Sequence, residues 1–429
     1  NGSLQIRGGT GLFTGTPPYV WISNQAGNNG VLFGDLNVRA VKDKNDNIIS
    51  DGRPSLGFTG NMDTYKPAEG SATRSDIAIT DPDFKYPSLW KSNIAADYKF
   101  GDGWVATVEL LYSKDINAIY HDNIGLYRTE QFVNDGGAGN ARPYYNGYYS
   151  DREGNQKAAN HVVMLRNTSK GHSLYTTFQL QKNFVDGILK GLYLNGSYSF
   201  GQSRGVTDGT SSVATSAWKY RAALDGNAEE VGYTAGSFDG RLLLSASYTA
   251  NWSKYAATSF GLIYQRYRPF RYSYCYNGDA NGDSQFSNDL MYIPANFDEV
   301  KDHLLPGDFD SQEDAWKAMN AFIEQDPYLS KHRGEYAERN GAVAPFANQL
   351  DLSVSHDIKI YQKNGRSHTL RFSFNIANFL NLLNRNWGVV QTTVLGNQQY
   401  QFLTIPKGQG PSAANNYTCL LYTSDAADE

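Results

Sequence analysis

The chain has 429 residues, of which 30 are Tyr, 21 are Phe and 42 are Gly; 19% are charged, and the net charge is −5. This balance excludes the basic surface of a nucleic-acid-binding protein and the composition of an acidic disordered tail. No apolar run approaches the roughly 18 residues of a transmembrane helix, so any passage through a membrane would use β-strands.

Apolar and polar residues alternate along most of the chain, and the first two segments with this pattern are 4–13 and 89–100. In the third, "WVATVELLY", Trp104, Ala106 and Tyr112 lie on one face, together with a valine and a leucine. The opposite face carries a threonine and a glutamate in the middle of the strand. A period of two residues predicts β-strands with chemically different faces.

The same alternation recurs in "RLLLSASYTANW", "QLDLSVSHDIKI" and "TLRFSFNI". Their polar faces carry Arg241, Asp351, Asp357 and Arg371. A soluble β-sandwich also has one dry and one wet face. Aromatic residues at the ends of the apolar stripes and charges in mid-strand favour a transmembrane β-barrel, in which these charged side chains contact plug or substrate, or simply fill the lumen.

Connections between the predicted strands alternate between short and long, as in outer-membrane barrels with short periplasmic turns and long extracellular loops. The predicted fold class is therefore all-β: an incomplete antiparallel transmembrane β-barrel of about ten strands, whose open edges make it part of a larger barrel. The ten strands are expected near residues 4–13, 89–100, 104–118, 161–183, 190–205, 239–251, 255–275, 347–361, 367–379 and 397–405.

The longest loop contains a candidate metal site in "YNGDANGDSQFSNDLMYIP". Asp279, Asn281 and Asp283 have the spacing of the first three calcium ligands of an EF-hand loop. Leu290 replaces the usual acid at position twelve, although Asp289 adjoins it. The sequence thus predicts a Ca²⁺ site in the 279–290 loop, and the alternative is a turn rich in Asn, Asp and Gly that binds no metal.

A short helix is predicted near 311–325, inside the same loop. Ser311 can cap its first turn, and Asp314 has capping-box spacing. An apolar stripe runs from Trp316 to Ile323, so the helix is expected to pack within the loop.

Enzyme signatures are absent from the sequence. It has no GxSxG or HExxH motif, and its seven His residues make no ligand-spaced pair. Cys275 and Cys419 are the only cysteines, which excludes a disulfide framework and a CxxC site. We expect no catalytic residues. The aromatic loop "RPYYNGYYSDREG" either stacks sugars or packs the loop.

Four stretches, "RGGTGLFTGTPPYVWISNQ", "LRNTSKGHSLYTTFQLQKNF", "YNGDANGDSQFSNDLMYIP" and "RFSFNIANFLNLLNRNWG", resemble a known family. They are similar, in order, to the C-terminal barrel half of TonB-dependent outer-membrane receptors of Bacteroidetes, of the Oar-like kind with a carboxypeptidase-regulatory-like domain. The resemblance runs from Leu4 to about Lys407. Thr16 and Ala217 depart from the family pattern.

The resemblance implies a 22-stranded barrel with a plug, in the outer membrane of a Gram-negative cell. The partners it implies are the TonB–ExbB–ExbD complex, outer-membrane lipid and lipopolysaccharide, and the barrel-assembly machinery. Extracellular loops would capture a siderophore, vitamin B12, an oligosaccharide or a peptide, without bond chemistry or a required cofactor. The alternatives are an outer-membrane adhesin or structural barrel without transport, and a soluble carbohydrate-binding β-protein.

The last eleven residues, "CLLYTSDAADE", have neither strand periodicity nor turn chemistry. They resemble a translated frame of the transposase adapter used in sequencing libraries. We therefore predict two parts: 1–418, the C-terminal half of a receptor barrel that lacks plug and N-terminal domains, and 419–429, an artefactual tail unsupported by packing. A genuine divergent tail is the alternative.

Overall fold

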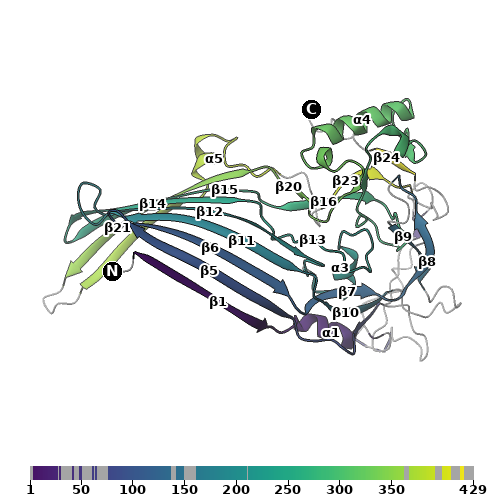
Figure 1. The fold of residues 1–429 in the computed structure, drawn as a ribbon, viewed down its shortest axis with the longest axis horizontal. Coiled ribbons are helices and arrows are strands. Elements are labelled where there is room, and N and C mark those ends of the chain that lie inside the picture. Colours follow the sequence, from purple (N-terminus) through teal and green to yellow (C-terminus); the bar gives the residue numbers. More distant parts are fainter. Residues whose placement is uncertain are drawn as a thin grey trace.

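The computed structural model describes residues 3–27, 29, 41–42, 48–50, 60–61, 63–64, 76–136, 142–148, 161–209, 211–361, 367–391, 399–406 and 416–419. Most of these residues belong to antiparallel β-sheet, which confirms the predicted all-β fold class (Figure 1). No helix among the described residues is both long and apolar enough to cross a membrane.

One large sheet, here called the wall sheet, dominates the molecule (Figure 1). Nine of its strands follow one another in sequence order, each antiparallel to its neighbours, and the short β13 (Gly232–Tyr233) pairs with the end of β12. The nine strands are β1 (Leu4–Thr14), β5 (Ser88–Phe100), β6 (Trp104–Asp115), β11 (His172–Asn183), β12 (Leu192–Gly205), β14 (Arg241–Ser253), β15 (Ala256–Tyr267), β21 (Ala347–Tyr361) and β22 (Ser367–Ile376).

The wall sheet is open. In the described part of the chain, β1 and β22 each have a strand partner on one side only. Their outer edges therefore present unpaired backbone N–H and C=O groups. This agrees with the predicted incomplete barrel.

The pairing register sorts side chains into rows of one chemical kind. One row across five strands reads Ile6, Ala96, Val108, Phe178 and Tyr198. The large members of this apolar row stay exposed, from 67% for Ile6 to 44% for Val108. Because side chains alternate between faces along each strand, the neighbouring rows are polar and lie on the other face.

Short and long connections alternate as predicted, so all short turns lie at one end of the wall sheet. Gly101 and Gly103, both at positive φ, lie in the turn between β5 and β6, where L side chains are disfavoured. The long connections run over 15–87, 116–171, 206–240 and 268–346.

The long connections, together with β23 and β24 from the segment after β22, build a second region at the other end of the wall sheet, here called the cap (Figure 1). It contains the sheets β4-β10-β7, β8-β9, β17-β19 and β18-β24-β23-β16-β20. Its elements are α1 (Tyr19–Gly27), β4 (Ile77–Thr80), β7 (Ala118–Asn123), β8 (Leu126–Val133), β9 (Arg142–Tyr148), β10 (Val162–Thr168), α3 (Ala214–Lys219), β16 (Arg271–Asn277), β17 (Tyr292–Ile293), η2 (Phe297–Glu299), β18 (Leu304–Leu305), α4 (Gln312–Gln325), η3 (Leu329–Lys331), β19 (Glu335–Tyr336), β20 (Ala342–Val343), β23 (Gln399–Thr404) and β24 (Tyr417–Cys419).

Three further elements complete the described structure. The strands β2 (Val41–Lys42) and β3 (Ile48–Ser50) pair with each other. The short helix α5 (Phe379–Leu383) follows β22.

Helix α4 confirms the helix predicted near 311–325. The Ser311 hydroxyl accepts a hydrogen bond from the Asp314 backbone N–H at 3.1 Å, and it donates to the Asp314 carboxylate at 2.7 Å. Met319 and Ile323 are buried in the main core of the cap, with Trp316 packed against that core. The predicted stripe therefore packs within the loop.

Three predicted strands are corrected. Segments 161–183 and 255–275 each break into a cap strand and a wall strand, β10 and β11 in the first case, β15 and β16 in the second. Segment 397–405 is not a wall strand, because β23 pairs in parallel with β16 inside the cap. Adjacent Phe402 and Leu403 are both buried there, which a two-faced wall strand does not allow.

The start of the predicted tail is also corrected. Cys419 lies in β24, opposite Leu403 of β23, and is only 3% exposed. The expectation that the tail is unsupported by packing is therefore wrong at Cys419. Residues 420–429 lie outside the described residues, and the boundary after 418 stays a prediction.

Candidate functional site

The polar face of the wall sheet is cross-linked by side-chain hydrogen bonds between neighbouring strands. On β5, Asp97 accepts from Arg7 at 3.0 Å and from Thr107 at 2.6 Å. Gln179 of β11 donates to Asn195 of β12 at 2.8 Å. These pairs link neighbouring strands of the sheet through their polar side chains.

All four charged residues singled out on the predicted polar faces lie on this face. Arg371 binds Asp357 through two hydrogen bonds, at 2.6 and 2.8 Å. Arg241 donates to Gln265 at 2.8 Å, and Asp351 accepts from the backbone N–H of residue 378 at the same distance. Each therefore has a hydrogen-bond partner within this chain.

The predicted calcium residues form a compact turn after β16. Asp279 accepts from the backbone N–H groups of Gly282 and Ser284 at 2.6 and 2.8 Å. Asn281 accepts from the N–H of Asp283 at 3.0 Å. The turn thus uses its side-chain oxygens as acceptors for its own backbone.

Asp289 approaches this turn from further along the chain. One of its oxygens accepts from the Ala280 N–H at 2.7 Å, and the other from the Arg142 guanidinium at 2.8 Å. Asn281, Asp283 and Asp289 are all buried. The structure therefore brings the four predicted residues into one cluster, of which Asp279 alone is only partly buried.

Burial and mutual repulsion disfavour the charged form of the carboxyl groups in this cluster. Burial, with the nearby charges of Asp289 and Asp279, raises the pKa of Asp283 well above its ordinary value. Burial raises the pKa of Asp289 to about 7, although Arg142 opposes the shift. Among the described residues, no three His, Cys, Asp or Glu side chains are arranged to hold a metal ion. Calcium binding stays a prediction.

The aromatic loop 142–154 is described only over 142–148. Tyr144, Tyr145 and Tyr148 are buried there, and the Tyr145 hydroxyl donates to Asp225 at 2.7 Å. These three rings pack the cap, which is one of the two roles that the sequence left open.

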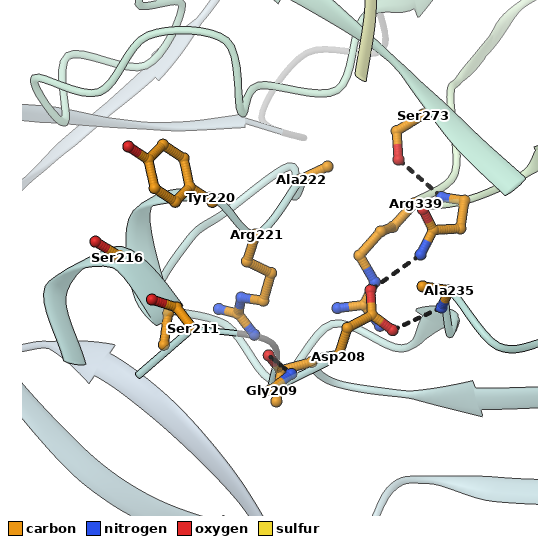
Figure 2. Close-up of a pocket in the computed structure, with 13 residues that line it drawn as sticks. Asp208, Gly209, Ser211, Ser216, Tyr220, Arg221, Ala222, Ala235, Ser273 and Arg339 are labelled. Atoms are coloured by element: carbon orange, nitrogen blue, oxygen red, sulfur yellow. Dashed lines mark hydrogen bonds between the residues drawn. The ribbon is translucent and has the colours of Figure 1, made fainter. Parts of the chain in front are cut away.

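The sequence did not predict the cavity inside the cap (Figure 2). Its volume is about 520 Å³, within the range of small-molecule sites. The lining comes from the loop after β12, from α3 and the residues that follow it, from β16, and from the loop before β20. The lining residues are Thr207, Asp208, Gly209, Ser211, Ser216, Ala217, Tyr220, Arg221, Ala222, Ala235, Ser273, Arg339 and Asn340.

Two arginines dominate the chemistry of this cavity. Arg221 and Arg339 lie 118 positions apart in the sequence, and each is only 5% exposed. Both donate a hydrogen bond to the carbonyl of Val206, the residue after β12. This shared acceptor brings the two guanidinium groups together beside the cavity. Within the described part of the chain, their Nε atoms have no hydrogen-bond partner.

Asp208 is the carboxylate of the cavity lining. It accepts from the Ala235 N–H at 2.7 Å and from the Asn340 side chain at 3.1 Å (Figure 2). Both of its oxygens are therefore committed to neutral donors. No local sequence motif marks this site, because its charged residues are brought together only by the folding of the cap.

Comparisons with known proteins add little. No family model matches the chain, and no curated protein matches it. Among solved structures, the FrpB iron transporter from Neisseria meningitidis (F3-3 variant) is similar with a TM-score of 0.27 and 8% identity. The match covers 68% of this chain and 35% of that chain, and at this TM-score it carries no argument.

Proposed function

We propose that this chain forms part of the barrel wall of a TonB-dependent transporter in the outer membrane of a Gram-negative bacterium. Its cap would capture a solute outside the cell, and a plug would gate import. The role is binding and gating, without bond chemistry and without a required cofactor. The observation that carries the membrane assignment is the exposed apolar face of the wall sheet.

That face is too large and too regular for contact with water. Apolar side chains of mid-strand positions, such as Phe178, Leu262 and Phe374, are 42–64% exposed. Monomeric soluble proteins rarely expose a contiguous apolar patch of more than a few hundred Å². Aromatic residues near the strand ends, including Trp90 and Phe100, suit the girdles of a barrel at the membrane interfaces.

The polar face and the open edges support a wide lumen. Hydrogen-bonded charged pairs such as Arg371 and Asp357 are typical of a barrel interior. The outer edges of β1 and β22 need strand partners, since lipid cannot satisfy their backbone groups. We propose that further strands complete the barrel. The TonB–ExbB–ExbD partnership and the Bacteroidetes origin rest on the resemblance of the four quoted stretches.

Neighbouring residues on β11 test the membrane assignment. Phe178 and Gln179 lie on opposite faces of one strand. We would introduce Phe178→Cys and Gln179→Cys into the protein in its own membrane; Cys275 and Cys419 are buried. The thiol of the Phe178→Cys variant is expected to react with a lipid-dissolved maleimide and to be protected from a water-soluble one. Reaction of that thiol with the water-soluble reagent in intact membranes would contradict the proposal.

Transport needs a separate test. Removal of TonB from the host cell is expected to abolish energy-dependent solute uptake while leaving surface binding intact. Uptake that continues without TonB would favour a passive barrel.

A further inference from the structure

We propose that the cavity inside the cap binds a small hydroxylated oxyanion, an organic molecule that carries a carboxylate or phosphate group. This inference rests on the proposed function, because it names the class of solute that the cap would capture. Its binding can be measured without transport.

The two guanidinium groups lack a counter-charge at contact distance among the described residues. Arg221 donates to the carbonyls of Val206, at 3.3 Å, and of Gly226. Arg339 donates to the carbonyls of Gly205 and Val206. Carbonyl oxygens are neutral acceptors, so they orient the guanidinium planes without neutralising them. A buried charge is stable only when it is paired.

Arg221 and Arg339 both line the cavity, and neither has a carboxylate at contact distance among the described residues. Their Nε–H groups are buried without a partner in the described structure and have no accessible surface toward the cavity. A bound oxyanion would therefore act by supplying the missing counter-charge, since guanidinium groups are well matched to carboxylate and phosphate.

The cavity lining carries more positive than negative charge, which also favours an anion. Two guanidinium groups face one carboxylate, Asp208, which is already bonded to Ala235 and Asn340. Burial lowers the pKa of Arg339 to about 10, Asp208 opposes this shift, and Arg221 adds to it. More distant carboxylates such as Glu230 raise the pKa of Arg221, yet burial still lowers it overall.

Three hydroxyl groups add neutral donors. Thr207, Ser211 and Ser273 each accept a hydrogen bond from a backbone N–H, at 3.2, 3.2 and 2.8 Å. A hydroxyl that accepts in this way keeps its own proton to donate. The lining therefore offers three hydroxyl donors and two guanidinium groups against a single carboxylate.

The volume distinguishes an organic anion from a bare ion. The cavity has a volume of about 520 Å³. A water molecule occupies about 30 Å³ in the liquid, so the cavity is much larger than one water or one phosphate ion needs. The hydroxyls of the lining and the ring of Tyr220 suit the remainder of a polyhydroxylated molecule. The inferred ligand class is therefore a sugar acid, a sugar phosphate or a hydroxycarboxylate.

The test is calorimetric titration of the detergent-solubilised protein, purified from its own membrane, with three probes. Glucuronate and glucose 6-phosphate carry the two oxyanions, and glucose is the neutral control. We expect at least one oxyanion to bind at least tenfold more tightly than glucose, and the better of the two identifies the charged group. Equal binding of glucose, or no binding of either oxyanion, would overturn the inference.

Variants assign the binding to this cavity. Ser216→Glu places a negative charge in the lining and should weaken oxyanion binding at least tenfold; Arg339→Gln should do the same. Arg333→Gln, whose guanidinium bonds Pro294 and Asn320 outside the cavity, is the matched control and should bind normally. Thermal unfolding checks each fold. If Arg339→Gln misfolds, Ser216→Glu decides.

The membrane assignment and the ligand class can be refuted independently of each other. Loss of oxyanion binding, with the thiol of Phe178→Cys still protected by lipid, would overturn only the ligand class. Oxyanion binding by a protein in which that thiol is accessible from water would overturn only the membrane assignment.

Discussion

At the scale of single residues, Arg142 is the most tightly held charge of the cap. Its guanidinium binds Asp289 at 2.8 Å, Asp135 at 3.3 Å and the carbonyl of Leu290. The rings of Tyr276 and Tyr336 lie 5.7 and 5.4 Å from it. Removing one partner of a buried ion pair leaves the other charge uncompensated.

Arg142→Met is therefore expected to destabilise the cap by about 3–5 kcal/mol. Arg128→Met, which removes a half-exposed partner of Asp225, should cost only about 0–1 kcal/mol. Thermal unfolding followed by proteolysis of the cap measures both. Equal losses in the two variants would refute the central role of Arg142.

His121 gives the cap a pH dependence. Burial, with a smaller contribution from Arg221, lowers its pKa from 6.5 to about 4. The ring packs edge-on against Trp21, with 4.8 Å between centroids. Below pH 6.5 the unfolded state takes up a proton that the folded state refuses, so this contribution to stability is lost as the pH falls.

Acidification from pH 7 to pH 5 is expected to remove about 2 kcal/mol of cap stability through His121, since one pKa unit corresponds to about 1.4 kcal/mol. His121→Gln should flatten that part of the pH profile of the melting temperature. His332→Gln, which lies outside this contact, is the matched control. An unchanged slope in His121→Gln would show that other groups cause the pH dependence.

At the scale of elements, strands with similar residues have opposite surroundings. Phe402 of β23 is 2% exposed in the main core of the cap, whereas Phe374 of β22 lies on the apolar face of the wall sheet. Phe402→Ala should cost about 3–5 kcal/mol, because it leaves a cavity in a packed core. Phe374→Ala should cost less in cap stability, since it leaves no such cavity. Thermal unfolding of the cap compares the two, and the reverse order would contradict the assignment of β23 to the cap.

Local patterns predicted the wall strands because alternation is decided within each strand. The α4 helix could be predicted for the same reason, since its capping residues Ser311 and Asp314 lie within one turn. The position of β23 could not be predicted from local sequence, because its partner β16 lies more than a hundred residues earlier. The adjacent apolar residues Phe402 and Leu403 were the available signal that this strand is buried on both faces.

The same distinction separates the two candidate sites. The spacing of Asp279, Asn281 and Asp283 was visible in the sequence, and the structure places these residues in one turn. The approach of Arg221 to Arg339 was not predictable, because tertiary packing of the cap alone brings them to Val206.

At the scale of the whole molecule, the open edges of the wall sheet govern membrane insertion. Backbone groups on the outer edges of β1 and β22 have no partner in lipid. The 429-residue chain refolded alone into micelles is therefore expected to lack the heat-modifiable migration of a closed barrel. Protein extracted from its own membrane should show it. A heat-modifiable band from the isolated chain would contradict the open sheet.

The parallel pairing of β23 with β16 also ties the cap to the chain beyond the described wall strands. The sheet β18-β24-β23-β16-β20 takes strands from both sides of β21 and β22 in the chain, so its pairing closes a loop that contains both of them. Such long-range pairing forms slowly, because a long loop must close first. Truncation before β23 would therefore spare every described wall strand, yet it would leave β16 without its parallel partner and the cap core without Phe402.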